Sequence, residues 1–325
     1  MQCNNCFLHI EDARKETRCS ICNSPLHITC SIKEDNKHYC DMCFTLKQEE
    51  KPTLTFDVPD VIRRSYIETY KSCPYKFYLT VIKGITDENE TIYNRLGIDM
   101  HELFDKACHN PDYTIDDMTS DLNVSWSNYE SLFEDAEQEQ KMLQRSKFCI
   151  NNFYNILPTL PDKPLSTEET IVFDIGDDLP KISTTSDRID FVDDELEISD
   201  WKTGQTMVGK KLSSDLQAPL YIYGVQQKYG IPVRKFTFYY LQDGKTRVFE
   251  RQKDGSYICT VRKRIYRIVP LDAIREVQSI FSQIKKGNFN IPTNNSMHYT
   301  CKICHLSKTS NCKGADIQSW ELLQH

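Results

Sequence analysis

Two aspartates and one lysine with the chemistry of a metal site lie close together near the middle of this 325-residue chain. Asp200 and Lys202 are separated by one residue in a strand-like segment, so their side chains project from the same face. Asp187 belongs to the preceding strand pattern and can lie beside Asp200. Carboxylates this close repel each other unless a divalent cation lies between them. The group suits metal-assisted phosphodiester hydrolysis, although exposed residues of an ordinary hairpin have the same pattern.

The elements that must position these residues follow from the hydrophobic pattern. Ser65 and Glu68 form a capping-box pattern that predicts a helix continuing through Leu79. A second helix is expected at 97–108, and residues 115–158 are expected to be mostly helical. The remaining pattern predicts strands at 169–175, 181–192 and 195–203, a tight turn at 193–195, a helix at 213–230, a hairpin at 236–252 and a helix at 271–286. The fold class is therefore α/β, a core sheet flanked by helices.

Fourteen cysteines indicate bound metal, because no signal peptide or membrane-spanning run points to a disulfide-forming compartment. Seven of them lie in the first 43 residues, a segment too short to build an apolar core. Two ligands with two other residues between them deliver two donors to one zinc ion, and eight ligands imply two ions. The predicted zinc ligands are Cys3, Cys6, Cys19, Cys22, His27, Cys30, Cys40 and Cys43.

The order of these ligands resembles that of a PHD-type finger, in which ligand pairs alternate between two sites. The resemblance implies one zinc on Cys3, Cys6, His27 and Cys30, and a second on Cys19, Cys22, Cys40 and Cys43. The chain departs from the family in two ways: only nine residues separate Cys30 from Cys40, and His38 stands where Trp is usual. Histone-tail binding, a general protein or DNA docking role and a RING-type ubiquitin ligase all stay open.

Residues 61–315 resemble the RecB-type branch of the PD-(D/E)xK nucleases, which includes the AddB helicase–nuclease subunit, exonuclease V and the CRISPR-adaptation exonuclease. The matching motifs stand in the family's order: SYIETYKSCPYKFYL at 65–79, LGIDMHELF at 96–104, SDRIDFVDDELEISDWKTG at 186–204, QAPLY at 217–221 and a closing CKIC…C at 301–312. The resemblance implies a restriction-endonuclease-like core sheet and a divalent-metal-dependent (Mg²⁺ or Mn²⁺) deoxyribonuclease.

The resemblance also implies a role for each matching residue. Asp187, Asp200, His101 and the backbone carbonyl of Trp201 would bind the catalytic Mg²⁺ or Mn²⁺, and Lys202 would be the catalytic lysine. Gln217 and Tyr221 share one helix face and would line the site or contact the DNA backbone. Glu168, at the start of its strand, matches an additional acidic position of the family. Glu169 is the alternative residue for that position. Thr184 stands where glycine is common in the family.

Four remote cysteines form a second metal system. Spacing alone leaves zinc, an iron–sulfur cluster or no ligand open for Cys73, Cys301, Cys304 and Cys312. The family resemblance implies a [4Fe–4S] cluster on these four thiolates. Cys108, Cys149 and Cys259 are expected to be ordinary buried cysteines.

The chain is thus expected to comprise a finger at 1–44, a linker at 45–60, a nuclease domain at 61–315 and a tail at 316–325. The net charge of −7 means that phosphate binding must depend on local basic patches. Arg262, Lys263, Arg264 and Arg267 form one candidate patch, although such runs are often solvated faces.

The functional expectation is an intracellular DNA nuclease, in the nucleus or from a virus or mobile element. It would act, as an exonuclease, on single-stranded ends or tails in repair, recombination or mobile-element processing. A helicase is an expected partner for unwinding, because the chain lacks a GxxxxGK[ST] phosphate loop. A chromatin protein or another protein is expected to bind through the finger, and no membrane partner is expected. The alternative is a non-catalytic DNA or chromatin adaptor with an inactive nuclease fold.

Overall fold

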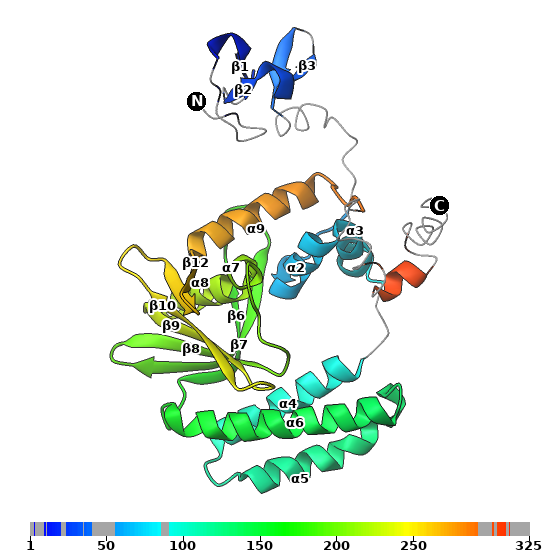
Figure 1. Ribbon diagram of the computed structural model, residues 1–325, viewed down its shortest axis with the longest axis vertical. Coiled ribbons are helices and arrows are strands. Elements are labelled where there is room, and N and C mark those ends of the chain that lie inside the picture. The colour runs from blue at the N-terminus through cyan, green and yellow to red at the C-terminus, as the bar shows by residue number, and fades with distance from the viewer. Residues whose placement is uncertain are drawn as a thin grey trace. The chain divides into compact units, whose positions relative to one another are not determined.

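The computed structural model divides into two compact units, Met1–Thr55 and Phe56–His325 (Figure 1). It describes residues 3, 10, 12–20, 24–34, 36–40, 56–85, 91–291, 301, 304–309 and 312. The predicted ligands Cys6, Cys22 and Cys43, the predicted tail at 316–325 and most of the predicted linker lie outside these residues.

The described residues of the first unit include two small hairpins. Strand β1 (Glu16–Arg18) pairs with β2 (Pro25–His27), and β3 (Ile32–Glu34) pairs with β4 (Lys37–Tyr39). Short 3-10 turns lie at Ala13–Lys15 and Ile28–Cys30. The buried cluster of the described residues contains Ile10 and Leu26, and its other members are cysteines. The apolar surface buried by the described residues of this unit is small against the entropy of ordering the chain, which favours metal binding as a source of stability.

The second unit is built on one mixed sheet of eight strands. Its order is β12-β11-β10-β9-β8-β7-β5. Strand β6 also pairs with β7, along the edge that does not pair with β8. Strand β5 is parallel to β7 and β8 is parallel to β9, whereas the other neighbours are antiparallel. The strands are β5 (Val61–Arg63), β6 (Ser166–Phe173), β7 (Lys181–Val192), β8 (Glu195–Lys202), β9 (Val233–Tyr240), β10 (Lys245–Arg251), β11 (Tyr257–Val261) and β12 (Arg264–Ile268).

Helices cover both faces of this sheet, which confirms the expected fold class (Figure 1). Helices α2, α8 and α9 contribute to one buried core with the strands, and α4, α5 and α6 build a second core with Trp201 and Leu241. The helices are α2 (Arg64–Ser72), α3 (Pro74–Phe77), α4 (Ile92–His109), α5 (Ile115–Trp126), α6 (Ala136–Ile156), α7 (Lys211–Ser214), α8 (Gln217–Tyr229) and α9 (Pro270–Lys285), with a π-helical turn at Tyr78–Ile82 and 3-10 turns at Ser127–Leu132, Leu157–Thr159 and His305–Lys308. Within the described residues, no helix has the length and apolar character needed to cross a membrane.

The first predicted helix is wrong in two respects. Helix α2 begins at Arg64 with no side-chain cap, and Glu68, the expected capping partner, instead accepts a hydrogen bond from the Leu216 backbone N–H at 3.2 Å. The helix ends before Cys73, which is extended, because a residue before proline is pushed out of the helical region. Pro74 then opens α3.

Helix α2 contacts α9 and the segment that follows α9. The Tyr70 hydroxyl donates to the Asn288 carbonyl at 2.7 Å, and Lys71 pairs with Glu276 of α9 at 2.8 Å. Strand β5, directly before α2, pairs with residues 181–183 of β7. The start of the unit is therefore fixed by contacts with β7 and α9.

Two hairpins turn through residue pairs with positive φ. Asp193 and Asp194 join β7 to β8, with φ of 50° and 63°, which agrees with the predicted tight turn. Arg262 and Lys263 join β11 to β12, with φ of 47° and 68°. Two-residue loops with both φ positive match the right-handed twist of the strands they connect. The sequence does not predict the second hairpin, because arginine and lysine are not typical of turns with positive φ.

Candidate metal centre

The hairpin formed by β7 and β8 carries Asp187, Asp200 and Lys202. Arg188 is the cross-strand partner of Ser199, so Asp187 and Asp200 follow that pair at adjacent positions on the two strands. The Lys202 ammonium lies 2.7 Å from Asp200 Oδ2. Trp201, between them, turns its indole to the opposite face, where the ring packs 5.1 Å from that of Phe153. The alternation of strand β8 thus separates a polar face from a packed one.

A cluster of three possible metal donors lies beside this hairpin. His101 of α4 places Nδ1 at 3.4 Å from Glu168 Oε1 and 3.5 Å from Asp187 Oδ1. One donor atom from each of the three residues lies within 4.8 Å of the other two. Imidazole nitrogen and carboxylate oxygen are ligands that Mg²⁺ and Mn²⁺ accept. The donor set therefore fits a divalent cation.

Glu168 takes an unusual backbone conformation to reach this cluster. It lies inside β6, which begins at Ser166, and not at the mouth of a strand beginning at 169 as expected. Its φ is 44°, in the left-handed region that side chains rarely adopt. The side chain of Glu169 turns instead towards α8, where it pairs with Lys228 and accepts from the Tyr229 hydroxyl at 2.6 Å. The structure thus brings Glu168 to His101 and keeps Glu169 away.

Hydrogen bonds from the surrounding fold hold both aspartates. The Trp201 backbone N–H donates to Asp187 Oδ2 at 2.6 Å, so the Trp201 peptide borders the cluster even though its indole does not. The Gln217 side-chain amide donates to Asp200 Oδ1 at 2.6 Å. Gln217 begins α8, and Gly224 of that helix lets it lie close to β6, because an added Cβ would be 2.6 Å from the Phe173 ring.

Burial and the closeness of the carboxylates shift the pKa values of residues in and beside the cluster. Burial raises the pKa of Asp200 to about 6, with the Asp187 charge adding to the effect and Lys202 opposing it. Burial lowers the pKa of His101, but the neighbouring Asp187 and Glu168 outweigh it and raise the pKa to about 10. Burial also raises the pKa of Tyr221, which lies one turn after Gln217. The protein therefore concentrates negative charge that a cation would relieve.

Four cysteines from distant parts of the second unit line one small cavity. They are Cys73, Cys301, Cys304 and Cys312, and Leu79, Ile291 and Leu306 complete much of the wall. None of the four is in a disulfide. Cys73 stands at the break between α2 and α3, where its sulfur accepts a hydrogen bond from the Lys76 backbone N–H at 3.3 Å. Burial raises the pKa of the Cys73 and Cys301 thiols, so a bound cation is needed to keep them as thiolates. The donor set fits a soft metal or an iron–sulfur cluster.

The other three cysteines of this unit are separate from the cavity. Cys108, Cys149 and Cys259 are all buried. Burial raises the pKa of each thiol, which keeps them protonated and unreactive.

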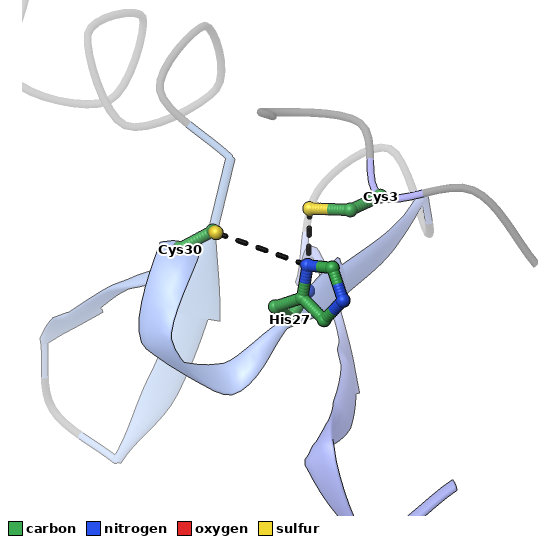
Figure 2. Close-up of side chains that lie close together, drawn as sticks. All are labelled: Cys3, His27 and Cys30. Carbon is green, nitrogen blue, oxygen red and sulfur yellow. Dashed lines mark hydrogen bonds between the residues drawn. The ribbon is translucent and has the colours of Figure 1, made fainter. Parts of the chain in front are cut away.

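The first unit brings together three of the ligands expected for its first zinc. Cys3, His27 and Cys30 offer donor atoms within 4.8 Å of one another. Figure 2 shows His27 lying between the two cysteines, with Cys30 Sγ 3.9 Å from His27 Nδ1. The Cys3 sulfur also accepts from the His27 backbone N–H at 3.3 Å. Cys19 and Cys40, expected at the second zinc, are both buried.

The basic residues at 262–267 lie in the β11–β12 hairpin and have different surroundings there. Arg262 and Arg264 line a cleft of the second unit, whereas Arg267 pairs with Asp254 at 2.8 Å. Arg247 of β10 lines the same cleft and was missed in the sequence. The signal for it was weak, since a single arginine in the strand pattern of the 236–252 hairpin does not reveal which neighbour it faces.

Comparison with known proteins identifies the second unit. The family model described as the PD-(D/E)XK nuclease superfamily matches residues 64–309, which is most of the chain. No curated protein matches the chain.

Proposed function

Because the chain belongs to the PD-(D/E)XK nuclease superfamily, we propose that it hydrolyses phosphodiester bonds of DNA at the site built around Asp187 and Asp200. The observation that carries the proposal is the set of donor atoms of His101, Glu168 and Asp187, which lie within 4.8 Å of one another. Asp200 and Lys202 on the adjacent strand complete the site. The superfamily implies a metal-dependent phosphodiesterase; the deoxyribonuclease activity and the assignment of each residue are proposals.

His101, Asp187, Asp200 and the Trp201 carbonyl would hold a divalent cation, Mg²⁺ or Mn²⁺, with Glu168 at the additional acidic position. When bound, the cation would supply positive charge that stabilises negative charge on the phosphate under attack. The chain's own residues do the remaining work. Lys202 orients the attacking water and offsets charge in the transition state, since its ammonium is already fixed at 2.7 Å from Asp200. Gln217 fixes one Asp200 oxygen, and Tyr221 lies on the same helix face.

The chain's motifs support a narrower assignment. We assign it to the RecB-type branch, as an exonuclease acting on single-stranded ends or tails. The support is the family's ordered motifs together with the convergence of Cys73 on the C-terminal cysteines. This assignment fits DNA repair, recombination or mobile-element processing in the nucleus, with unwinding supplied by a partner helicase.

The cysteine groups support two metal systems. We assign a [4Fe–4S] cluster to Cys73, Cys301, Cys304 and Cys312, and two zinc ions to the first unit. The grouping of Cys3, His27 and Cys30 matches the first site of a PHD-type finger. The proposed role of that finger is to dock on a chromatin protein or on DNA.

A cleavage assay tests the activity. Purified protein is incubated with end-labelled single-stranded and tailed DNA, and with the matching RNA, in Mg²⁺ or Mn²⁺. We expect cleavage of DNA by the wild type and loss of at least about 100-fold for Lys202→Ala. Lys181→Ala is the matched control, because Lys181 belongs to the same sheet and also pairs with an aspartate. Binding without cleavage under both metals would support the non-catalytic adaptor instead.

Metal analysis tests the cofactors. We expect about four irons and two zincs per chain, with visible absorbance from the cluster. Cys73→Ser should lose iron and keep zinc, whereas Cys259→Ser, at a buried cysteine away from the cavity, should keep both. Zinc in place of iron at the four-cysteine site would contradict the cluster assignment.

A further inference from the structure

The second unit contains a cleft of about 900 Å³ that has no role in the chemistry proposed above. Its wall is formed by the loop Gln205–Gly209, which follows Lys202 in the chain, and by the strands β10, β11 and β12. Its charged lining consists of Asp243, Lys245, Arg247, Arg262 and Arg264. The cleft is therefore rich in cations, in a chain whose net charge is −7.

Most of these cations are available to a ligand. Lys245 pairs with Asp243 at 2.8 Å, so these two charges offset each other. In the described part of the chain, neither Arg262 nor Arg264 forms an ion pair, and both are exposed. Arg247 donates from Nη1 to the Thr246 carbonyl at 2.7 Å, and its Nε is buried without a partner there. A buried donor without an acceptor is costly, which favours an anionic ligand in the cleft.

The register of the sheet aligns this cleft with the catalytic strand. Asp200 is opposite Phe238, and Phe238 is opposite Arg247, so the three residues form one row on the same face. The Lys202 ammonium lies 5.5 Å from the centre of the Phe238 ring, which links the metal centre to this row. Further along, Val261 and Arg264 face each other and both line the cleft.

The distances follow from the spacing of strands. Neighbouring strands lie about 4.8 Å apart, so β10 is about 10 Å and β12 about 19 Å from β8. Phosphates along one strand of B-form DNA are about 3.4 Å apart along the axis. For a strand stacked as in B-form DNA, the cleft therefore corresponds to about three to six nucleotides from a phosphate held at Asp200.

We propose that this cleft binds the phosphodiester backbone of the strand being cut, about three to six nucleotides to one side of the cleaved bond. The inference rests on the proposed nuclease function and adds the path of its substrate. Arginine suits this role, because its planar guanidinium donates two hydrogen bonds to one phosphate. Such contacts position the strand and carry no sequence information.

A charge-matched pair of double variants tests the binding. Arg262→Asn with Arg264→Ala removes two cations from the cleft, and asparagine tolerates the positive φ at position 262. Arg267→Ala with Arg275→Ala removes two cations that pair with aspartates elsewhere. Both pairs are made in the Lys202→Ala background, and affinity for a 20-nucleotide single-stranded DNA is measured over a salt series.

The cleft variant should bind about 25-fold more weakly at 0.1 M salt, because each lost phosphate contact is worth about fivefold there. The slope of log affinity against log salt should become shallower by about 1.4. The control should keep the affinity and slope of its parent. Arg262→Lys with Arg264→Lys should recover most of the affinity, which separates lost charge from misfolding. Equal affinities of the cleft variant and the control would overturn the proposal.

Cleavage of substrates of graded length tests the position. With Lys202 intact, the cleft variant should cut a substrate that extends six or more nucleotides beyond the cleaved bond about 25-fold less efficiently in kcat/KM. A substrate extending two nucleotides or fewer on that side should be cut as well as by the wild type. A uniform loss at every length would refute the position. If the wild type cuts nothing, the nuclease proposal fails, and the binding measurement still decides whether the cleft holds nucleic acid.

Discussion

The left-handed backbone of Glu168 predicts that glycine at this strand position gives a more stable protein than alanine does. A residue with a side chain in the left-handed region is destabilised by about 1–2 kcal/mol, and φ at Glu168 is 44°. Glycine avoids that clash but loses about 0.5–1 kcal/mol through its greater freedom in the unfolded chain. Glu168→Gly should therefore be more stable than Glu168→Ala by roughly 0.5–1 kcal/mol. At Glu169, whose φ is not positive, the order should reverse by a similar amount.

Urea denaturation of the four variants measures this difference, with melting temperatures as a second reading. A change of 1 kcal/mol corresponds to a shift of about 2–4 °C in a unit of this size. If glycine is the less stable choice at both positions, the backbone of Glu168 is not strained and the reasoning fails.

The same variants separate stability from activity. Each change at Glu168 removes a carboxylate that lies 3.4 Å from His101, so cleavage should fall at least about 100-fold even where stability rises. Glu168→Gln keeps the size of the side chain and should lose activity equally. Full activity in Glu168→Gln would remove this residue from the proposed site.

Three further outcomes follow from the described contacts. Gln217→Ala removes the donor to Asp200 Oδ1, so the Mg²⁺ concentration that gives half-maximal cleavage should rise about 10- to 100-fold; Gln226→Ala, on the same helix but bonded to Val233, should leave it unchanged. Cys73→Ser opens the longest proposed metal-closed loop and should destabilise the second unit by up to about 5 kcal/mol in urea, in proportion to the iron lost. Burial raises the pKa of Glu169, but its hydrogen bonds and ion pair outweigh this and hold the pKa below its usual value. The stability it contributes is present above about pH 4.3 and is lost as the pH falls through the lowered pKa. Glu169→Gln should therefore be less stable than the wild type by about 1 kcal/mol at pH 7, and the difference should shrink as the pH falls through that lowered pKa.

Local periodicity accounts for what the sequence could predict. Residues two apart on a strand share a face, which is why Asp200 and Lys202 could be expected together and Trp201 on the other side. The residues Asp193 and Asp194 suit a tight turn because aspartate tolerates positive φ. The order of helices and strands also follows from such patterns, and it fixes the fold class.

Contacts between distant segments account for what could not be predicted. The left-handed backbone of Glu168 inside a strand has no local signature, because its neighbours suggest only that a strand begins nearby. The row that joins Asp200, Phe238 and Arg247 depends on the register of three strands. The end of α2 at Cys73 is different, since Pro74 is a local signal for it: the residue before a proline is pushed out of the helical region even where the helical pattern continues beyond the proline.

Helix α2 has a consequence for the order in which the protein is made. Its Tyr70 is bonded to a residue 218 positions later. At a ribosomal rate of about 5–20 residues per second, that partner emerges roughly 10–40 s after Tyr70 does. During this interval Ile67 and Tyr70, both buried in the finished protein, lack the part of their core that α9 contributes. A chain that stalls before α9 therefore leaves the apolar face of α2 incompletely covered and open to chaperones and proteases.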